Sequence, residues 1–95
     1  MNTFIETVKS LCPSESAAAY AWGILVRGAE VGWFREADVT ELLDMLRSDG
    51  DWISEELGFT FSGDQLRVNL LDDDVLCDPA DVVAALAALE VRLRT

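Results

Sequence analysis

Histidine is absent from this chain of 95 residues, which removes the commonest general base and the commonest metal ligand. Only seven basic residues accompany eighteen acidic ones, and Lys9 is the only lysine. A phosphate-binding loop needs a lysine after spaced glycines, and the segment around Gly28 and Gly32 offers neither. No nucleophile elbow is present. The sequence therefore predicts a protein that is not an enzyme and uses no cofactor.

Cysteine is scarce as well, and the two cysteines, Cys12 and Cys77, lie far apart in the chain. Disulfides are rare in the cytosol, so we expect two buried free thiols rather than a bridge or a zinc site. Aspartates at 49–51 and 72–74 supply hard oxygen ligands, but neither run has the ligand spacing and glycine of an EF-hand loop. The prediction is that no metal is bound.

Long apolar runs are also missing. The longest uncharged stretch, Ser16 to Val26, has 11 residues, whereas a membrane-spanning helix needs roughly 20. Met1 to Glu6 has neither the basic nor the apolar region of a signal peptide. We therefore expect a cytoplasmic protein without membrane contact, folded as a single domain over residues 1–95.

Apolar residues recur at helical spacing over much of the chain, and cap residues mark where helices begin. Gly23, inside the second expected helix, costs about 1 kcal/mol relative to alanine, which is tolerable if another element packs close to it. The expected helices are one from Thr3 that ends before Pro13, one capped by Ser14 or Ser16 and stopped by Gly28 or Gly32, one from Asp38, one or two turns over Asp51–Leu57, and one that starts at Asp78-Pro79.

Between these helices the apolar period changes from 3.6 to 2. Residues 59–61 and 66–70 alternate, and turn-forming residues lie between them at 62–65. This pattern predicts one β-hairpin, which must pack on helices because two strands alone are marginally stable in water. The predicted fold class is α+β: four to five short helices, one antiparallel β-hairpin at about 59–70 packed on them, and a closing C-terminal helix.

Acidic charge is concentrated in one segment. Residues 49–81 hold ten acids and one arginine, so this segment carries −9 of the formal −11 of the chain. Such charge costs self-repulsion, which a partner would offset, although a high-salt host is an alternative cause. Nucleic acid and anionic membranes have the wrong sign to be partners. The expected partner is a basic protein surface.

Carboxylates at alternate strand positions, or at i and i+4 on a helix, lie about 5–6.5 Å apart, near the spacing of neighbouring phosphates. They could therefore occupy a surface that normally holds nucleic acid. The alternative is local: Asp51 and Asp78 as helix caps, and Glu55 and Asp81 near helix dipoles. The candidate array is Asp49, Asp51, Glu55, Glu56, Asp72, Asp73, Asp74, Asp78 and Asp81.

Aromatic residues are the second candidate contact type. Trp33 and Phe34 follow Gly32 in an expected loop, and we predict that either ring, if exposed, contacts a partner or a second copy. Trp22 and Trp52 are expected in the core.

Small size and strong acidity make the chain similar to inhibitors from phages and mobile elements, including anti-CRISPR, anti-restriction and DNA-mimic proteins. The profile is also similar to immunity proteins that neutralise basic nuclease toxins. These likenesses imply an inhibitor that covers a nucleic-acid-binding surface, and they transfer no residue. The remaining alternative is a homodimeric structural or regulatory domain joined by exposed aromatics, whose charge serves solubility alone.

Overall fold

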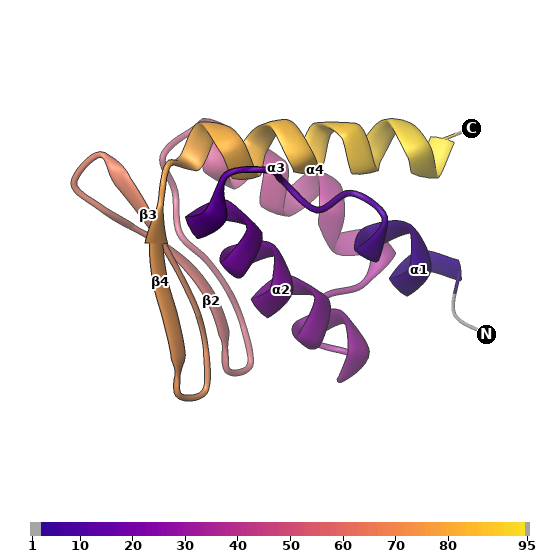
Figure 1. Cartoon of the computed structure of the whole chain (residues 1–95), viewed down its shortest axis with the longest axis horizontal. Helices are drawn as coiled ribbons and strands as arrows, with labels where there is room; N and C mark the ends of the chain where they lie inside the picture. The colour runs from indigo at the N-terminus through magenta and orange to yellow at the C-terminus, as the bar shows by residue number, and fades with distance from the viewer. Residues whose placement is uncertain (1–2, 95) are drawn as a thin grey trace.

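Four α-helices and a four-stranded antiparallel sheet make up residues 3–94, the part of the chain that the computed structural model describes (Figure 1). The α+β class is confirmed, and the prediction of a single hairpin is wrong. The elements are α1 (Thr3–Lys9), α2 (Ser16–Glu30), the 3-10 turn η1 (Glu36–Asp38), α3 (Val39–Arg47), β1 (Trp52–Ser54), β2 (Leu57–Ser62), β3 (Gln65–Leu70), β4 (Asp73–Cys77) and α4 (Pro79–Arg94).

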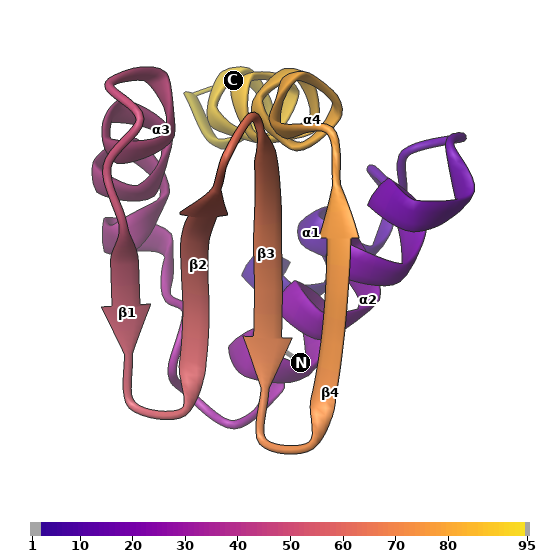
Figure 2. The same cartoon turned by 90° about the vertical axis from the view of Figure 1, so that its left-hand side faces the viewer.

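The sheet is a meander in the order β1-β2-β3-β4, and its helices lie on one side (Figure 1). Register places Trp52, Phe59, Val68 and Val75 side by side in one row that faces the helices. Because side chains alternate along a strand, the neighbouring residues face the other way. Figure 2 shows that within residues 3–94 no helix covers that second face.

Helix boundaries follow the expected capping chemistry. Gly32, with a φ of 85°, ends α2: its own N–H donates to the Ala29 carbonyl, and the Trp33 N–H donates to the Gly28 carbonyl at 2.8 Å. This is a Schellman motif, which favours glycine at the left-handed position. The start of α4 is also confirmed, because the Asp78 carboxylate accepts the Ala80 N–H at 2.9 Å. The cap of α2 is Glu15, however, and not a serine.

The expected helical turns over Asp51–Leu57 are replaced by β1 and a tight turn. Trp52 points into the core, and its indole N–H donates to Glu41 of α3 at 3.0 Å. The Asp51 carboxylate accepts the Phe61 N–H at 3.1 Å, so it supports the sheet instead of capping a helix. Tertiary packing of the tryptophan therefore outweighs the local helix signal.

The aspartate triplet lies outside the predicted hairpin, but two of its residues belong to the sheet. Asp73 and Asp74 begin β4, which pairs with β3 over five residue pairs. Ion pairs offset the poor strand propensity of aspartate, because Asp73 contacts Arg27 and Asp74 contacts Arg67 at 3.4 Å. The predicted hairpin itself is confirmed as β2 and β3, with the Ser62–Gln65 pair closing its turn.

The core is entirely apolar: among the described residues no polar or charged side chain is buried. Aromatic rings link the layers of the core, since the ring centroid of Phe34 lies 5.6 Å from that of Phe4 and 6.1 Å from that of Trp52. The buried Trp22 indole donates to the Val8 carbonyl at 2.7 Å and so joins α2 to α1. No helix in residues 3–94 has the length and apolarity needed to cross a bilayer.

Close packing occurs at Gly28 and not at Gly23. A Cβ on Gly28 would lie 2.7 Å from Leu57 Cδ2, whereas a Cβ on Gly23 would meet nothing within 4 Å. The cost of Gly23 in α2 is therefore uncompensated by packing.

We predict that Gly23→Ala raises the free energy of unfolding by about 0.5–1 kcal/mol, because alanine lowers the entropy of the unfolded chain and clashes with nothing. Gly28→Ala is the matched control and is expected to lower stability by about 1 kcal/mol or more, since the buried Leu57 must move. Urea unfolding measures both. Equal effects of the two substitutions would contradict this account of α2.

Candidate protein-binding surface

The antiparallel order separates the acidic residues into two groups. The β1–β2 and β3–β4 turns share one end of the sheet, which we call the double-turn end, defined by residues 55–56 and 71–74. The opposite single-turn end holds residues 49–51, 63–64 and 78–81. With a rise of about 3.3 Å per residue, the length of β2 keeps the two ends roughly 17 Å apart. The nine candidate acids do not form one continuous array.

Acids at the single-turn end have local structural roles. Asp49 has a φ of 59° and occupies the left-handed position of a Schellman motif, in which the Gly50 N–H donates to the Met45 carbonyl at 2.8 Å. Asp51 and Asp78 accept the backbone hydrogen bonds described above. Asp81 lies in the first turn of α4, where a negative charge is favoured by the helix dipole. Local structure therefore accounts for these four candidates.

The double-turn end is different. Glu55, Glu56 and Asp72 are exposed, and within residues 3–94 none of their side chains forms a hydrogen bond or an ion pair. The two turns that carry them lie about 10 Å apart, since two strand spacings separate their centres. Asp73 and Asp74 adjoin them, each paired with an arginine. Of the predicted array, only Glu55, Glu56 and Asp72 come together without a structural role.

Two non-glycine residues at the double-turn end have a positive φ, as Asp49 has at the single-turn end. Each of the three hairpin turns has a positive φ at its first central residue, and these residues are Glu55 (55°), Gly63 (66°) and Leu71 (54°). Glycine suits this position, whereas a left-handed conformation costs other residues about 1–2 kcal/mol. Leu71 is 67% exposed, so little core packing offsets its strain. Stability alone does not explain a leucine there.

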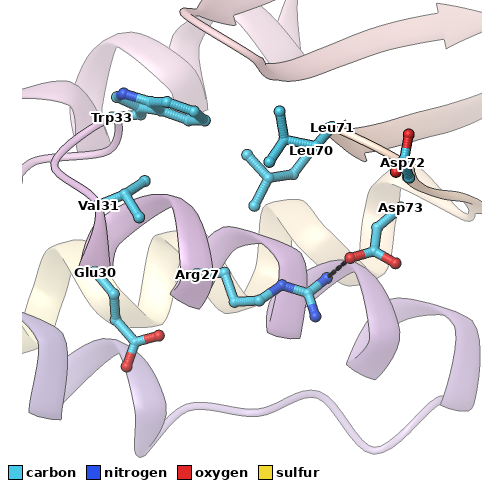
Figure 3. A pocket seen from close by; sticks show the side chains of 8 residues that line it. All are labelled: Arg27, Glu30, Val31, Trp33, Leu70, Leu71, Asp72 and Asp73. Carbon is cyan, nitrogen blue, oxygen red and sulfur yellow. Dashed lines mark ion pairs between the residues drawn. The ribbon is translucent and has the colours of Figure 1, made fainter.

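A groove opens beside Leu71, between the end of α2 and the β3–β4 turn (Figure 3). Its volume is about 460 Å³, within the range of small-molecule pockets. Apolar side chains dominate its surface, with Leu70, Leu71, Val31 and the Trp33 ring around the cavity. Val31 is 57% exposed.

Charged residues around the groove neutralise one another except for Asp72. Arg27 pairs with Asp73 (Figure 3), and Lys9 pairs with Glu30 at 3.3 Å. Asp72 has no such partner, so the net charge at the groove mouth is negative. No unpaired cation lines the groove among the described residues.

The structure separates the two aromatic candidates. Trp33 is half-buried and lines the groove, so its ring remains available to a partner. Phe34 is only 1% exposed and packs between the rings of Phe4 and Trp52. This burial removes Phe34 from the contact surface and corrects its place among the predicted partner-binding residues. Trp22 and Trp52 are core residues, as expected.

Sequence reasoning missed the groove residues Arg27, Val31 and Leu71. One signal was available, because Leu70 and Leu71 are adjacent at the end of an alternating strand. Since only one of two successive strand residues can face the core, the second leucine had to be exposed or to form a turn.

No family model matches the chain, and no match emerges from the curated proteins or from the solved structures. Among residues 3–94, no three His, Cys, Asp or Glu side chains are grouped so that they could hold a metal ion. The candidate site combines the groove with the acids of the double-turn end.

The two cysteines differ in environment, and the expectation that both are buried is wrong for Cys12, which is exposed. Cys77 is buried, and burial, assisted by the nearby acids Asp81, Glu15 and Asp78, raises the pKa of its thiol to about 11. The thiolate is the reactive form.

We predict that a maleimide or disulfide reagent at pH 8 modifies one thiol per native chain, namely Cys12. Cys77 is not modified, because its thiol is buried and because its pKa is raised to about 11. Mass spectrometry counts the adducts. The urea-unfolded protein should carry two, and the native Cys12→Ser variant should carry none. The raised pKa also makes the contribution of Cys77 to stability fall as pH rises from about 9 to about 11. Rapid native labelling of Cys77 would contradict its burial.

Proposed function

We propose that this protein binds a basic surface of another protein through the double-turn end of its sheet, and thereby inhibits it. The observation that carries the proposal is the contrast between the two acidic groups. Glu55, Glu56 and Asp72 are exposed without a structural role, whereas the four candidates at the single-turn end serve local structure.

Distance favours treating the double-turn end as one site. At physiological ionic strength the screening length is about 8 Å, so the acids on turns about 10 Å apart are screened from one another less than from the acids about 17 Å away. The nearest arginines, Arg27 and Arg67, are already paired with aspartates. The field presented to a partner is therefore negative, which favours encounter with basic surfaces.

Basic protein surfaces commonly hold nucleic acid, and carboxylates on the two turns would occupy the positions of phosphates. This mode of action fits the small inhibitors of phages and mobile elements, including anti-CRISPR, anti-restriction and DNA-mimic proteins. An immunity protein against a basic nuclease toxin would use the same contact. Both versions require a target whose nucleic-acid-binding face is blocked when this protein is bound.

We predict that the triple reversal Glu55→Lys, Glu56→Lys and Asp72→Lys abolishes capture of that target. The tagged protein is used as bait in nuclease-treated extracts of its host, and bound proteins are quantified by mass spectrometry. Three exposed ion pairs of about 0.5 kcal/mol each correspond to at least a tenfold loss of affinity. The captured target should release this protein when duplex DNA or RNA is added.

The matched control is the reversal of three exposed acids on the helical side, Glu6→Lys, Glu36→Lys and Asp44→Lys, which changes net charge by the same amount without touching the double-turn end. Circular dichroism verifies that both variants fold. If both reversals reduce capture equally, only the net charge matters. If neither does, or if nucleic acid fails to compete with the target, the proposed mode of binding is wrong.

A further inference from the structure

We propose that the groove beside Leu71 receives an apolar side chain that the basic partner carries between its lysines or arginines. The inference rests on the proposed function, because it supplies the same acidic interface with an anchor. The groove adjoins the acids of the double-turn end, since Leu71 and Asp72 form the β3–β4 turn and both line the cavity (Figure 3).

The shape and lining of the groove suit an anchor residue. Leu70 and the Trp33 ring are fixed by the fold, while Val31 and Leu71 stand exposed, at 57% and 67%, on the rim. Apolar side chains that enter such pockets commonly provide most of the affinity of a protein interface. A cavity of about 460 Å³ accommodates one large aliphatic or aromatic side chain with its neighbours.

Charge at the mouth selects a cationic occupant. Arg27 and Lys9 are engaged by Asp73 and Glu30, so neither attracts an anion. The uncompensated charges are Asp72 and, on the adjoining turn, Glu55 and Glu56. A second copy of this chain, with its own net charge of −11, is disfavoured for the same reason.

Leu71 supplies an independent argument. Its left-handed backbone would be better served by glycine or asparagine, and its side chain is largely outside the core. An outlier of this kind supports a hypothesis of function. Contact with a partner would bury the exposed leucine and give the strained turn a role.

The test uses three synthetic peptides titrated into the ¹⁵N-labelled full chain. The anchor peptide is acetyl-Lys-Arg-Leu-Phe-Arg-Lys-amide, the charge-only peptide replaces Leu-Phe by Gly-Ser, and the neutral peptide replaces each basic residue by Gln. We expect the anchor peptide to bind about tenfold more tightly than the charge-only peptide and to shift the Trp33 indole N–H and the Val31 and Leu71 amides. The neutral peptide should bind weakest.

Two variants distinguish the contribution of the groove to binding from that of the acids at the double-turn end. In Leu71→Asn the new residue tolerates a positive φ, so the fold is retained. This variant should bind the anchor peptide only as tightly as it binds the charge-only peptide. The triple reversal at Glu55, Glu56 and Asp72 should weaken both basic peptides by a similar factor. The ¹⁵N spectrum of each variant verifies its fold.

Equal binding of the two basic peptides, both weakened by the triple reversal, would overturn the groove inference and leave the proposed function standing. The claim that the occupant is cationic would be wrong if the triple reversal left binding of the anchor peptide unchanged, or if the neutral peptide bound as tightly as the anchor peptide. Either result would also count against the proposed function. Concentration-dependent dimerisation lost in Leu71→Asn, measured by sedimentation, would assign the groove to a second copy instead and overturn the inference.

Discussion

The ring of Trp52 connects the helical layer to the sheet, and the arrangement of the candidate surface depends on it. Its centroid lies 6.1 Å from those of both Phe34 and Phe59, and its indole N–H reaches Glu41 on α3. These contacts hold a three-residue strand, β1, that has little pairing energy of its own. Because β1 is extended, the following residues form a hairpin turn, which brings Glu55 and Glu56 to the same end of the sheet as Asp72.

Because no charged side chain of residues 3–94 is buried, the distribution of acids over the surface is decided by chain topology. The helices cover one face of the sheet, and the acidic segment 49–81 forms the strands and the connections at both of their ends. Self-repulsion is limited because strands about 17 Å long separate the two groups by more than the screening length. The same separation prevents the acids from forming one continuous phosphate-like array and makes the double-turn end the more informative group.

Local signals identified the elements that depend on local chemistry. The caps of α4 and the glycine stop of α2 were readable because hydrogen bonds between near neighbours form them. The outer strands were missed because distant residues stabilise them: β1 depends on Trp52 packing, and β4 on the core contacts of Val75 and Cys77 as well as on arginines from α2 and β3. For the candidate site, acid content was readable, but only the register showed which acids meet. The groove combines α2, its following loop and the β3–β4 turn, so no window of sequence contains it.

The meander repeats a two-residue turn every eight residues, at 55, 63 and 71, and each repeat needs a positive φ at the same position. The turn at the single-turn end has glycine there and is unstrained. Both turns at the double-turn end have residues that oppose this conformation, Glu55 and Leu71, and each side chain is exposed. Folding would favour glycine at all three turns. The departure occurs only at the end where the unpaired carboxylates and the apolar groove meet, which is the pattern expected where binding, and not stability, determines the residue.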